Sequence, residues 1–167
     1  MTPQPNSHGP RTPRFDSLQQ EAYLRVWRLY DRLKLLEEEL FAGHDLSSQQ
    51  YNTLRLLKAA LPGTMGTLEL ASRLVSRAPD ITRLVNKLED RGLVERQRGQ
   101  GDKRAVRVRL TPAGIRLLSD LAGPLAQVHQ RQLGHMSPGD LESLIRLIRS
   151  AGDPHEAEDS IWGKGHA

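Results

Sequence analysis

The spacing of apolar residues changes from a helical to a strand-like period within residues 70–114, and this change restricts the possible folds more than any other feature. The helical part has the i, i+3, i+4, i+7 spacing of a buried stripe, at Ile81, Leu84, Val85 and Leu88. Residues 105–110 then alternate apolar and basic side chains, and residues 93–98 can supply an antiparallel partner strand. A β-hairpin is therefore predicted directly after a helix.

A second short helix is predicted just before the striped one, so that the two form a helix-turn-helix. Thr67 can cap the first helix with its hydroxyl. Pro79 suits the first position of the second helix, where the missing N–H costs no helical hydrogen bond. Gly99 and Gly101 mark the turn of the hairpin, which has the position of a wing.

A long amphipathic helix is predicted before this motif. Its apolar residues alternate between spacings of four and three and form one seam that requires a partner helix: Ala22, Val26, Leu29, Leu33, Leu36 and Leu40. Gly43 ends this helix, and Ser47 opens the next with a capping box to Gln50. That second helix extends to about Ala60.

Two more helices are predicted after the hairpin. Pro112 starts one of them behind a Thr111 cap, and the Gly-Pro pair that ends at Pro124 should kink or interrupt it. Pro138 starts the last helix behind Ser137, with an apolar face of Leu141, Leu144, Ile145 and Ile148. The fold class is thus mainly α with a small antiparallel hairpin wing, in the order four helices, two strands, two helices.

Positive charge is concentrated on the predicted helix-turn-helix and wing. The chain has a net charge of +4, and residues 73–109 hold 11 Lys and Arg against 5 Asp and Glu. Such a focused field suits an anionic partner such as nucleic acid. The absence of cysteine excludes disulfides, thiolate metal sites and cysteine nucleophiles.

The second helix of the predicted pair carries side chains that can contact bases. In a helix-turn-helix this helix enters the major groove of DNA with its N-terminal residues at the base edges. Arg83 can pair with guanine and Asn86 with adenine, and Thr82 and Lys87 lie beside them. The alternative is a solvated helix face whose basic residues pair with neighbouring aspartates.

Basic residues also cluster around the turn of the hairpin. A narrow minor groove attracts arginine, which favours DNA contacts from the wing residues Arg96, Arg98, Asp102, Lys103 and Arg104. Alternatively, Asp102 pairs with Arg104 and stiffens the loop, while edge charges prevent aggregation. Both interpretations can hold together, because a braced wing positions its other basic groups.

Several short motifs occur in the order and spacing of one protein family. They are Leu70-Ala71, Ile81-Thr82-Arg83-Leu84-Val85, Leu88-Glu89, Gly92-Leu93-Val94-Glu95-Arg96, Asp102-Lys103-Arg104 and Leu110-Thr111-Pro112-Ala113-Gly114. With these motifs the chain resembles the MarR family of bacterial transcription regulators over about residues 18–149. The G-L-V-x-R, D-x-R and L-T-x-x-G motifs together are far more specific than any one alone.

The resemblance implies a homodimer built from the first, fifth and sixth helices, with a recognition helix in the major groove and the wing on the minor groove. It places the family's Thr-Arg pair at Thr82 and Arg83, and its D-x-R pair at Asp102 and Arg104. The chain departs from the family at residues 78–80, where many members have hydroxyl residues. A proline without an N–H and an aspartate repelled by phosphate suggest that base contacts begin at Thr82.

The domain organisation follows from this resemblance. Residues 15–150 are predicted to form a single MarR-like domain, with dimerisation helices at 15–46 and 111–150 and the DNA-binding lobe at 47–110. Residues 1–14 contain four prolines among polar residues and are expected to form a disordered arm. Residues 151–167 are polar and predicted to be a loose tail.

Three aromatic residues, Tyr23, Trp27 and Tyr30, flank the apolar seam of the first helix. In proteins of this resemblance, small aromatic or lipophilic compounds often bind between the dimerisation helices and the DNA-binding lobe. We expect these residues and Tyr51 to line such a ligand pocket, because aromatic rings offer stacking surface and a polar handle. The alternative is that they belong to the core or the dimer interface.

No catalytic residue, cofactor or metal site is predicted. The chain has no phosphate-binding glycine loop and no nucleophile motif, and its six histidines lack close i, i+4 partners. No apolar run approaches the ~20 residues that span a bilayer. We therefore expect a cytoplasmic protein without a membrane partner, associated with the nucleoid when bound.

Together these features predict a sequence-specific transcription regulator and not an enzyme. It would act as a repressor, bind a pseudo-palindromic operator in double-stranded DNA as a homodimer, and be released by a small aromatic or lipophilic effector. The alternatives are a non-specific architectural DNA-binding protein and a protein-only adaptor. The first would show no preference between DNA sequences, and the second would not need its basic residues.

Overall fold

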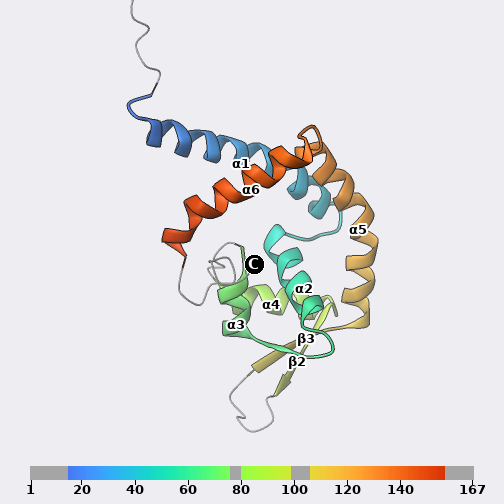
Figure 1. The fold of residues 1–167 in the computed structure, drawn as a ribbon. Coiled ribbons are helices and arrows are strands. Elements are labelled where there is room, and N and C mark those ends of the chain that lie inside the picture. The colour runs from blue at the N-terminus through green and yellow to red at the C-terminus, as the bar shows by residue number, and fades with distance from the viewer. Residues whose placement is uncertain (1–14, 76–79, 99–105, 157–167) are drawn as a thin grey trace, which may run out of the picture. The chain divides into compact units, whose positions relative to one another are not determined.

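The computed structural model describes residues 15–75, 80–98 and 106–156, with the side chain of Arg98 left out. Over these ranges it contains six α-helices, a short 3₁₀ helix and a three-stranded sheet (Figure 1). The chain divides into two units, residues 1–35 and 36–167. No helix in the described ranges is long and apolar enough to span a membrane.

Helix α1 (Leu18–Ala42) ends before Gly43, as predicted. Much of its apolar seam lies open: Val26 is 61% exposed, and Leu29 is exposed as well. Near its end, Phe41 is fully buried and belongs to the core of the second unit. The exposed part of the seam therefore lies toward its N-terminal end, whereas Leu36 and Leu40 are partly buried and pack against the core.

The capping box at the start of α2 (Ser48–Ala59) is confirmed. The backbone N–H of Gln50 donates to Ser47 Oγ at 3.2 Å, and the backbone N–H of Ser47 donates to Gln50 Oε1 at 2.8 Å. These reciprocal bonds satisfy two of the donors that a helix start leaves free. The side chains of Leu54 and Leu57 on this helix are fully buried.

The predicted starts of the next two helices are wrong by one or two residues. Helix α3 (Thr67–Arg73) contains Thr67 as its first residue, and its N-cap is Gly66, which makes no side-chain capping bond. Helix α4 (Ile81–Asp90) begins two residues after Pro79. Its N-cap is Asp80, whose Oδ1 accepts the backbone N–H of Arg83 at 2.8 Å. A carboxylate is a stronger capping group than a proline start, because it satisfies a free N–H and opposes the helix dipole.

The predicted hairpin is confirmed and gains a third strand. Strands β2 (Val94–Arg98) and β3 (Val106–Leu110) pair antiparallel, with Arg96 opposite Val108. Strand β1 (Met65–Gly66) pairs with the other edge of β3, so the sheet order is β1-β3-β2. Two residues are too few to show an alternating pattern in the sequence, which is why β1 was not predicted.

Helix α5 (Pro112–Leu133) runs without a break through Pro124. Of the predicted kink or interruption at this proline, the interruption is therefore wrong, and the kink stays a prediction. A proline inside a helix removes one hydrogen bond, but Leu121, Leu125 and Val128 of the same helix are all buried in the core. Burial of such side chains gives roughly 1.5–3 kcal/mol each, enough to hold the helix together across the lost bond.

Helix α6 (Pro138–Gly152) starts behind Ser137 as predicted, and none of its residues is buried. A 3₁₀ helix (Asp153–His155) follows it, with Pro154 in its first turn. The prediction of a loose tail from residue 151 is therefore wrong for residues 151–155, which continue in helical structure. The predicted arm at 1–14 and the tail beyond 156 lie outside the described residues.

Candidate nucleic-acid interface

Helix α4 has two chemically distinct faces. Leu84, Val85 and Leu88 are buried on one face and join the core. The four residues predicted to contact bases are all exposed on the rest of the helix: Thr82, Arg83, Asn86 and Lys87. The helix therefore presents one guanidinium, one ammonium, one amide and one hydroxyl to its surroundings, which are the groups that hydrogen bond to base edges and phosphates.

The cap at Asp80 explains the unusual sequence at the start of α4. Its carboxylate accepts the backbone N–H of Arg83, so the negative charge stabilises the positive N-terminal end of the helix dipole. The side chain of Arg83 is exposed. An aspartate close to the expected DNA surface is thus accounted for by helix capping.

Arg96 links strand β2 to helix α4 by hydrogen bonds. Its NH1 donates to Glu89 Oε2 at 2.6 Å, and its backbone N–H donates to Glu89 Oε1 at 3.1 Å. Its NH2 donates to Asn86 Oδ1 and, at 3.4 Å, to the backbone oxygen of Thr82. Arg96 was predicted as a DNA contact of the wing. In the structure its guanidinium hydrogen bonds to α4, and a direct DNA contact stays a prediction.

The C-terminal end of α4 is hydrogen bonded to the loop between α1 and α2. Arg91 NH1 donates to the backbone oxygen of Asp45 at 2.6 Å, and NH2 donates to that of His44 at 3.0 Å. Gly92 follows with a φ of +66°, a conformation that favours glycine. The sequence does not indicate this link, because its partners lie more than 40 positions apart.

Two basic residues of β3 also have protein partners. Arg107 Nε donates to Thr64 Oγ1, and Arg107 NH2 donates to the backbone oxygen of Thr64, both at 2.6 Å. Arg109 lies 3.9 Å from Glu95 across the β2–β3 pair, in a weak and exposed ion pair. The alternating basic residues of this strand therefore brace the sheet in part.

The base of the wing is joined to α5 by a close backbone contact. The backbone N–H of Thr111 donates to the oxygen of Leu93 at 3.1 Å, and Thr111 Oγ1 accepts the N–H of Gly114 at 3.1 Å. A Cβ at Gly114 would lie only 2.4 Å from that Leu93 oxygen. The L-T-x-x-G motif therefore needs glycine here because only glycine allows this approach.

Several predicted wing residues are not tested by the structure. Asp102, Lys103 and Arg104 lie outside the described residues, as does the side chain of Arg98. The predicted brace between Asp102 and Arg104 and the minor-groove contacts of the wing remain predictions.

The aromatic residues predicted to line a ligand pocket belong to the two different units. Tyr23, Trp27 and Tyr30 are exposed residues of the first unit, and the rings of Tyr23 and Trp27 lie 5.9 Å apart. Tyr51 belongs to the second unit, where its ring stacks on Phe41 at 4.5 Å. Burial raises the pKa of the Tyr51 hydroxyl above its ordinary value, while nearby Arg55 opposes this and Glu37 adds to it. A ligand pocket formed by these four residues therefore stays a prediction.

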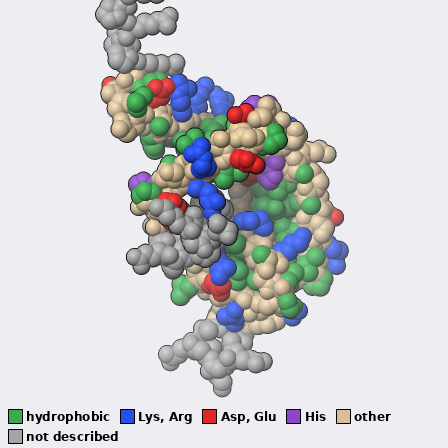
Figure 2. All heavy atoms as spheres, in the orientation of Figure 1, with side chains coloured by type: hydrophobic (Ala, Val, Ile, Leu, Met, Phe, Trp, Pro, Cys, Tyr) green, Lys and Arg blue, Asp and Glu red, His purple; other side chains and the backbone are tan. Residues whose placement is uncertain are grey.

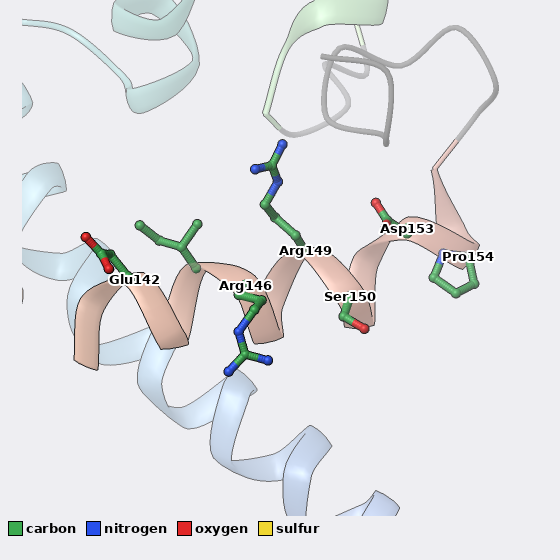
Figure 3. Close-up of a pocket in the computed structure, with 7 residues that line it drawn as sticks. Glu142, Arg146, Arg149, Ser150, Asp153 and Pro154 are labelled. Carbon is green, nitrogen blue, oxygen red and sulfur yellow. The ribbon is translucent and has the colours of Figure 1, made fainter. Parts of the chain in front are cut away.

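A hollow on α6 and the 3₁₀ helix contains none of these aromatic residues. Its lining comes from one stretch of chain: Glu142, Ile145, Arg146, Arg149, Ser150, Asp153 and Pro154. Figure 3 shows the side chains of Arg146 and Arg149 pointing away from each other. The hollow is an open helix surface whose charged groups do not converge on a ligand.

His129 has an acidic partner on α1. His129 Nε2 lies 3.4 Å from Glu37 Oε1, in an ion pair that requires a protonated imidazole. The part of the chain that the structure describes holds no group of three or more residues able to bind a metal ion.

Large apolar side chains remain at the surface of the single chain. Figure 2 shows them among Lys and Arg side chains. The exposed set includes Val26, Trp27, Leu29 and Tyr30 on α1 and Ile145, Leu147 and Ile148 on α6. Such a quantity of exposed apolar surface is typical of an interface with another protein chain.

Comparison with known proteins gives one consistent result. Residues 46–106 match the model of the MarR family. The chain is 56% identical to a MarR transcription factor from Planctomyces limnophilus, with a TM-score of 0.65 and coverage of 82% of this chain and 99% of that chain.

Two more distant structures share the fold. MarR from E. coli, in a mutant form complexed with operator DNA, is 22% identical with a TM-score of 0.71, covering 81% of this chain and 98% of that one. BpsR from Bordetella bronchiseptica is 22% identical with a TM-score of 0.72, covering 85% and 99%. DNA binding by BpsR is regulated by 6-hydroxynicotinic acid.

Proposed function

The chain belongs to the MarR family of transcription factors, and from that membership we propose that it binds specific DNA sequences through α4 and the β2–β3 wing. The observation that carries the proposal is the two-faced α4. One face is buried in the core, and the other exposes Thr82, Arg83, Asn86 and Lys87. The E. coli MarR with the same fold is bound to operator DNA, which supports a similar use of this helix.

We propose that the protein acts as a homodimer on a pseudo-palindromic operator. The uncovered apolar residues of α1 and α6 supply the surface that a second copy would bury. Two recognition helices related by a two-fold axis contact half-sites about one helical turn apart. A dimer that occupies a promoter excludes polymerase from it, which makes repression the expected result. The protein acts in the cytoplasm on chromosomal DNA and has no enzymatic role.

The test begins with fragments of the source genome that the purified protein selects. Fluorescence anisotropy then compares a selected fragment with a scrambled duplex over a range of salt concentrations. We expect preference for a pseudo-palindrome, and an affinity whose logarithm falls linearly with the logarithm of salt concentration. Equal affinity for the scrambled duplex would indicate an architectural protein, and absence of binding at low salt would indicate an adaptor.

We further propose that a small aromatic or lipophilic compound releases the protein from DNA through the exposed aromatic residues of α1. BpsR, whose DNA binding responds to 6-hydroxynicotinic acid, supports an aromatic acid as the first class to try. Trp27 presents the largest of these rings and is 58% exposed. Stacking on such a ring is a common mode of aromatic ligand binding.

Replacement of Trp27 with alanine should abolish the effector response while DNA binding is retained. The measurement is the release of a labelled operator by a panel of small aromatic acids that starts with 6-hydroxynicotinic acid. An unchanged response in the variant would show that Trp27 does not bind the effector. If no member of the panel releases the wild-type protein, the proposed effector class is wrong.

A further inference from the structure

The position of Arg96 between β2 and α4 gives it a role that its charge alone does not indicate. Three of the groups that accept its hydrogen bonds lie along one side of α4: the backbone oxygen of Thr82, Oδ1 of Asn86 and the carboxylate of Glu89. Asn86 is one of the residues proposed to contact bases, whereas Glu89 is acidic and pairs with Arg96. Arg96 therefore connects a DNA-contacting side chain to an internal anchor.

Glu89 holds Arg96 in place by two separate bonds. One carboxylate oxygen accepts from the guanidinium at 2.6 Å, and the other accepts from the backbone N–H of the same arginine at 3.1 Å. The side chain of Arg96 is only 27% exposed. Hydrogen bonds between charged groups are about twice as strong as those between neutral groups. The guanidinium is thus directed along α4 and is neutralised there.

This anchored guanidinium determines which way the amide of Asn86 faces. A guanidinium only donates hydrogen bonds, so the amide atom next to it must be the oxygen and not the nitrogen. An exposed amide without such a partner turns easily about its last torsion angle, which is broad for asparagine. A turned amide exchanges its donor and acceptor, and it would then match a different base edge.

We propose that Arg96 is a positioning residue for base recognition: it orients the amide of Asn86, with Glu89 as its anchor, and thereby sets the base preference of α4. This inference rests on the proposed function, because it assumes that α4 contacts bases. It replaces the view of Arg96 as a direct DNA contact of the wing. The interaction needs no contribution from the wing tip, since all its partners lie on β2 and α4.

The experiment measures the preference at every operator position by competition among single-base-pair variants. Asn86→Ala first identifies the base pair that Asn86 contacts. Arg96→Lys and Glu89→Gln should each lower the discrimination at that same base pair on the order of tenfold. Preferences at other positions and the salt dependence should stay as in the wild type. In an Asn86→Ala background, Arg96→Lys should have no further effect on discrimination.

Two controls match these changes. Asp90→Asn alters the charge of α4 by the same amount as Glu89→Gln at an exposed neighbour, and it should keep the wild-type discrimination. Arg109→Lys makes the same substitution as Arg96→Lys on β3, where the arginine faces Glu95 and not α4. Thermal unfolding of every variant separates a folding defect from a recognition defect.

The outcomes distinguish the inference from the proposed function. If the wild-type protein shows no base preference at any position, the proposed function fails and this inference fails with it. If the wild type is specific but Arg96→Lys and Glu89→Gln keep its preference throughout, only the positioning role is overturned. A uniform loss of affinity in Arg96→Ala, with a salt slope lower by about 1, would show that Arg96 contacts phosphate and would also overturn it.

Discussion

Replacement of Arg83 with alanine should remove most of the sequence-specific binding and leave the fold intact. The guanidinium is exposed, and it makes no hydrogen bond to another described residue. A bidentate contact from arginine to guanine contributes roughly 1–3 kcal/mol of discrimination. A homodimer carries two copies, so the expected loss is about 2–6 kcal/mol, or roughly 30-fold to more than ten-thousandfold. Anisotropy with the selected operator measures it.

The same residue allows charge and geometry to be separated. Arg83→Lys keeps the positive charge but cannot form the planar two-bond contact, so affinity for random duplex and the salt slope should change little. Arg116→Ala removes an exposed arginine from α5, outside the proposed interface, and it should bind the operator like the wild type. If Arg83→Ala weakens operator and random duplex by the same factor, Arg83 contacts phosphate and does not select bases.

Helix starts could be predicted wherever the capping chemistry is local. The bond between Ser47 and Gln50 needs only a four-residue segment, and the caps at Thr111 and Ser137 are equally local. The Asp80 cap of α4 is just as local, although Pro79 was predicted as the start of that helix. The start of α3 depends on more than local chemistry. Gly66 adopts an extended conformation because it pairs with Arg107, which is distant in the sequence, and α3 therefore begins at Thr67.

The continuity of α5 also depends on contacts with residues far away in the sequence. Proline has a strong local tendency to kink or interrupt a helix, and the sequence around Pro124 therefore predicts a kink or a break, of which the break does not occur. The three buried side chains on the same helix prevent it. Their burial depends on helices and strands distant in sequence, so no local pattern reveals it.

For the candidate site, the exposed residues of α4 could be predicted, but their partners could not. The buried stripe at Leu84, Val85 and Leu88 requires the polar residues between them to face outward. The direction of Arg96 depends on how β2 packs beside α4, and a sequence identifies it only as one basic residue among several. The direction of Arg96 matters because its hydrogen bonds to α4 are the basis for the positioning role proposed above.

Replacement of Gly114 with alanine should destabilise the protein strongly. The new Cβ would lie 2.4 Å from the backbone oxygen of Leu93 and 2.6 Å from Leu110 Cδ1. The Leu93 oxygen already accepts the backbone N–H of Thr111 at 3.1 Å, so it cannot move without loss of that bond. We expect a decrease in the free energy of unfolding of roughly 3 kcal/mol, the upper end for overpacked cores.

A glycine of α6 provides the matched control for this prediction. A Cβ at Gly139 would meet no atom within 4 Å beyond its chain neighbours, and alanine favours a helix over glycine by up to about 1 kcal/mol. Gly139→Ala should therefore be as stable as the wild type or more stable. Urea unfolding of both variants measures the difference. Equal stability of the two would show that β2 and α5 do not approach each other as closely as in the structure. A large difference would establish that the L-T-x-x-G motif holds the wing against α5 through backbone contact at Gly114.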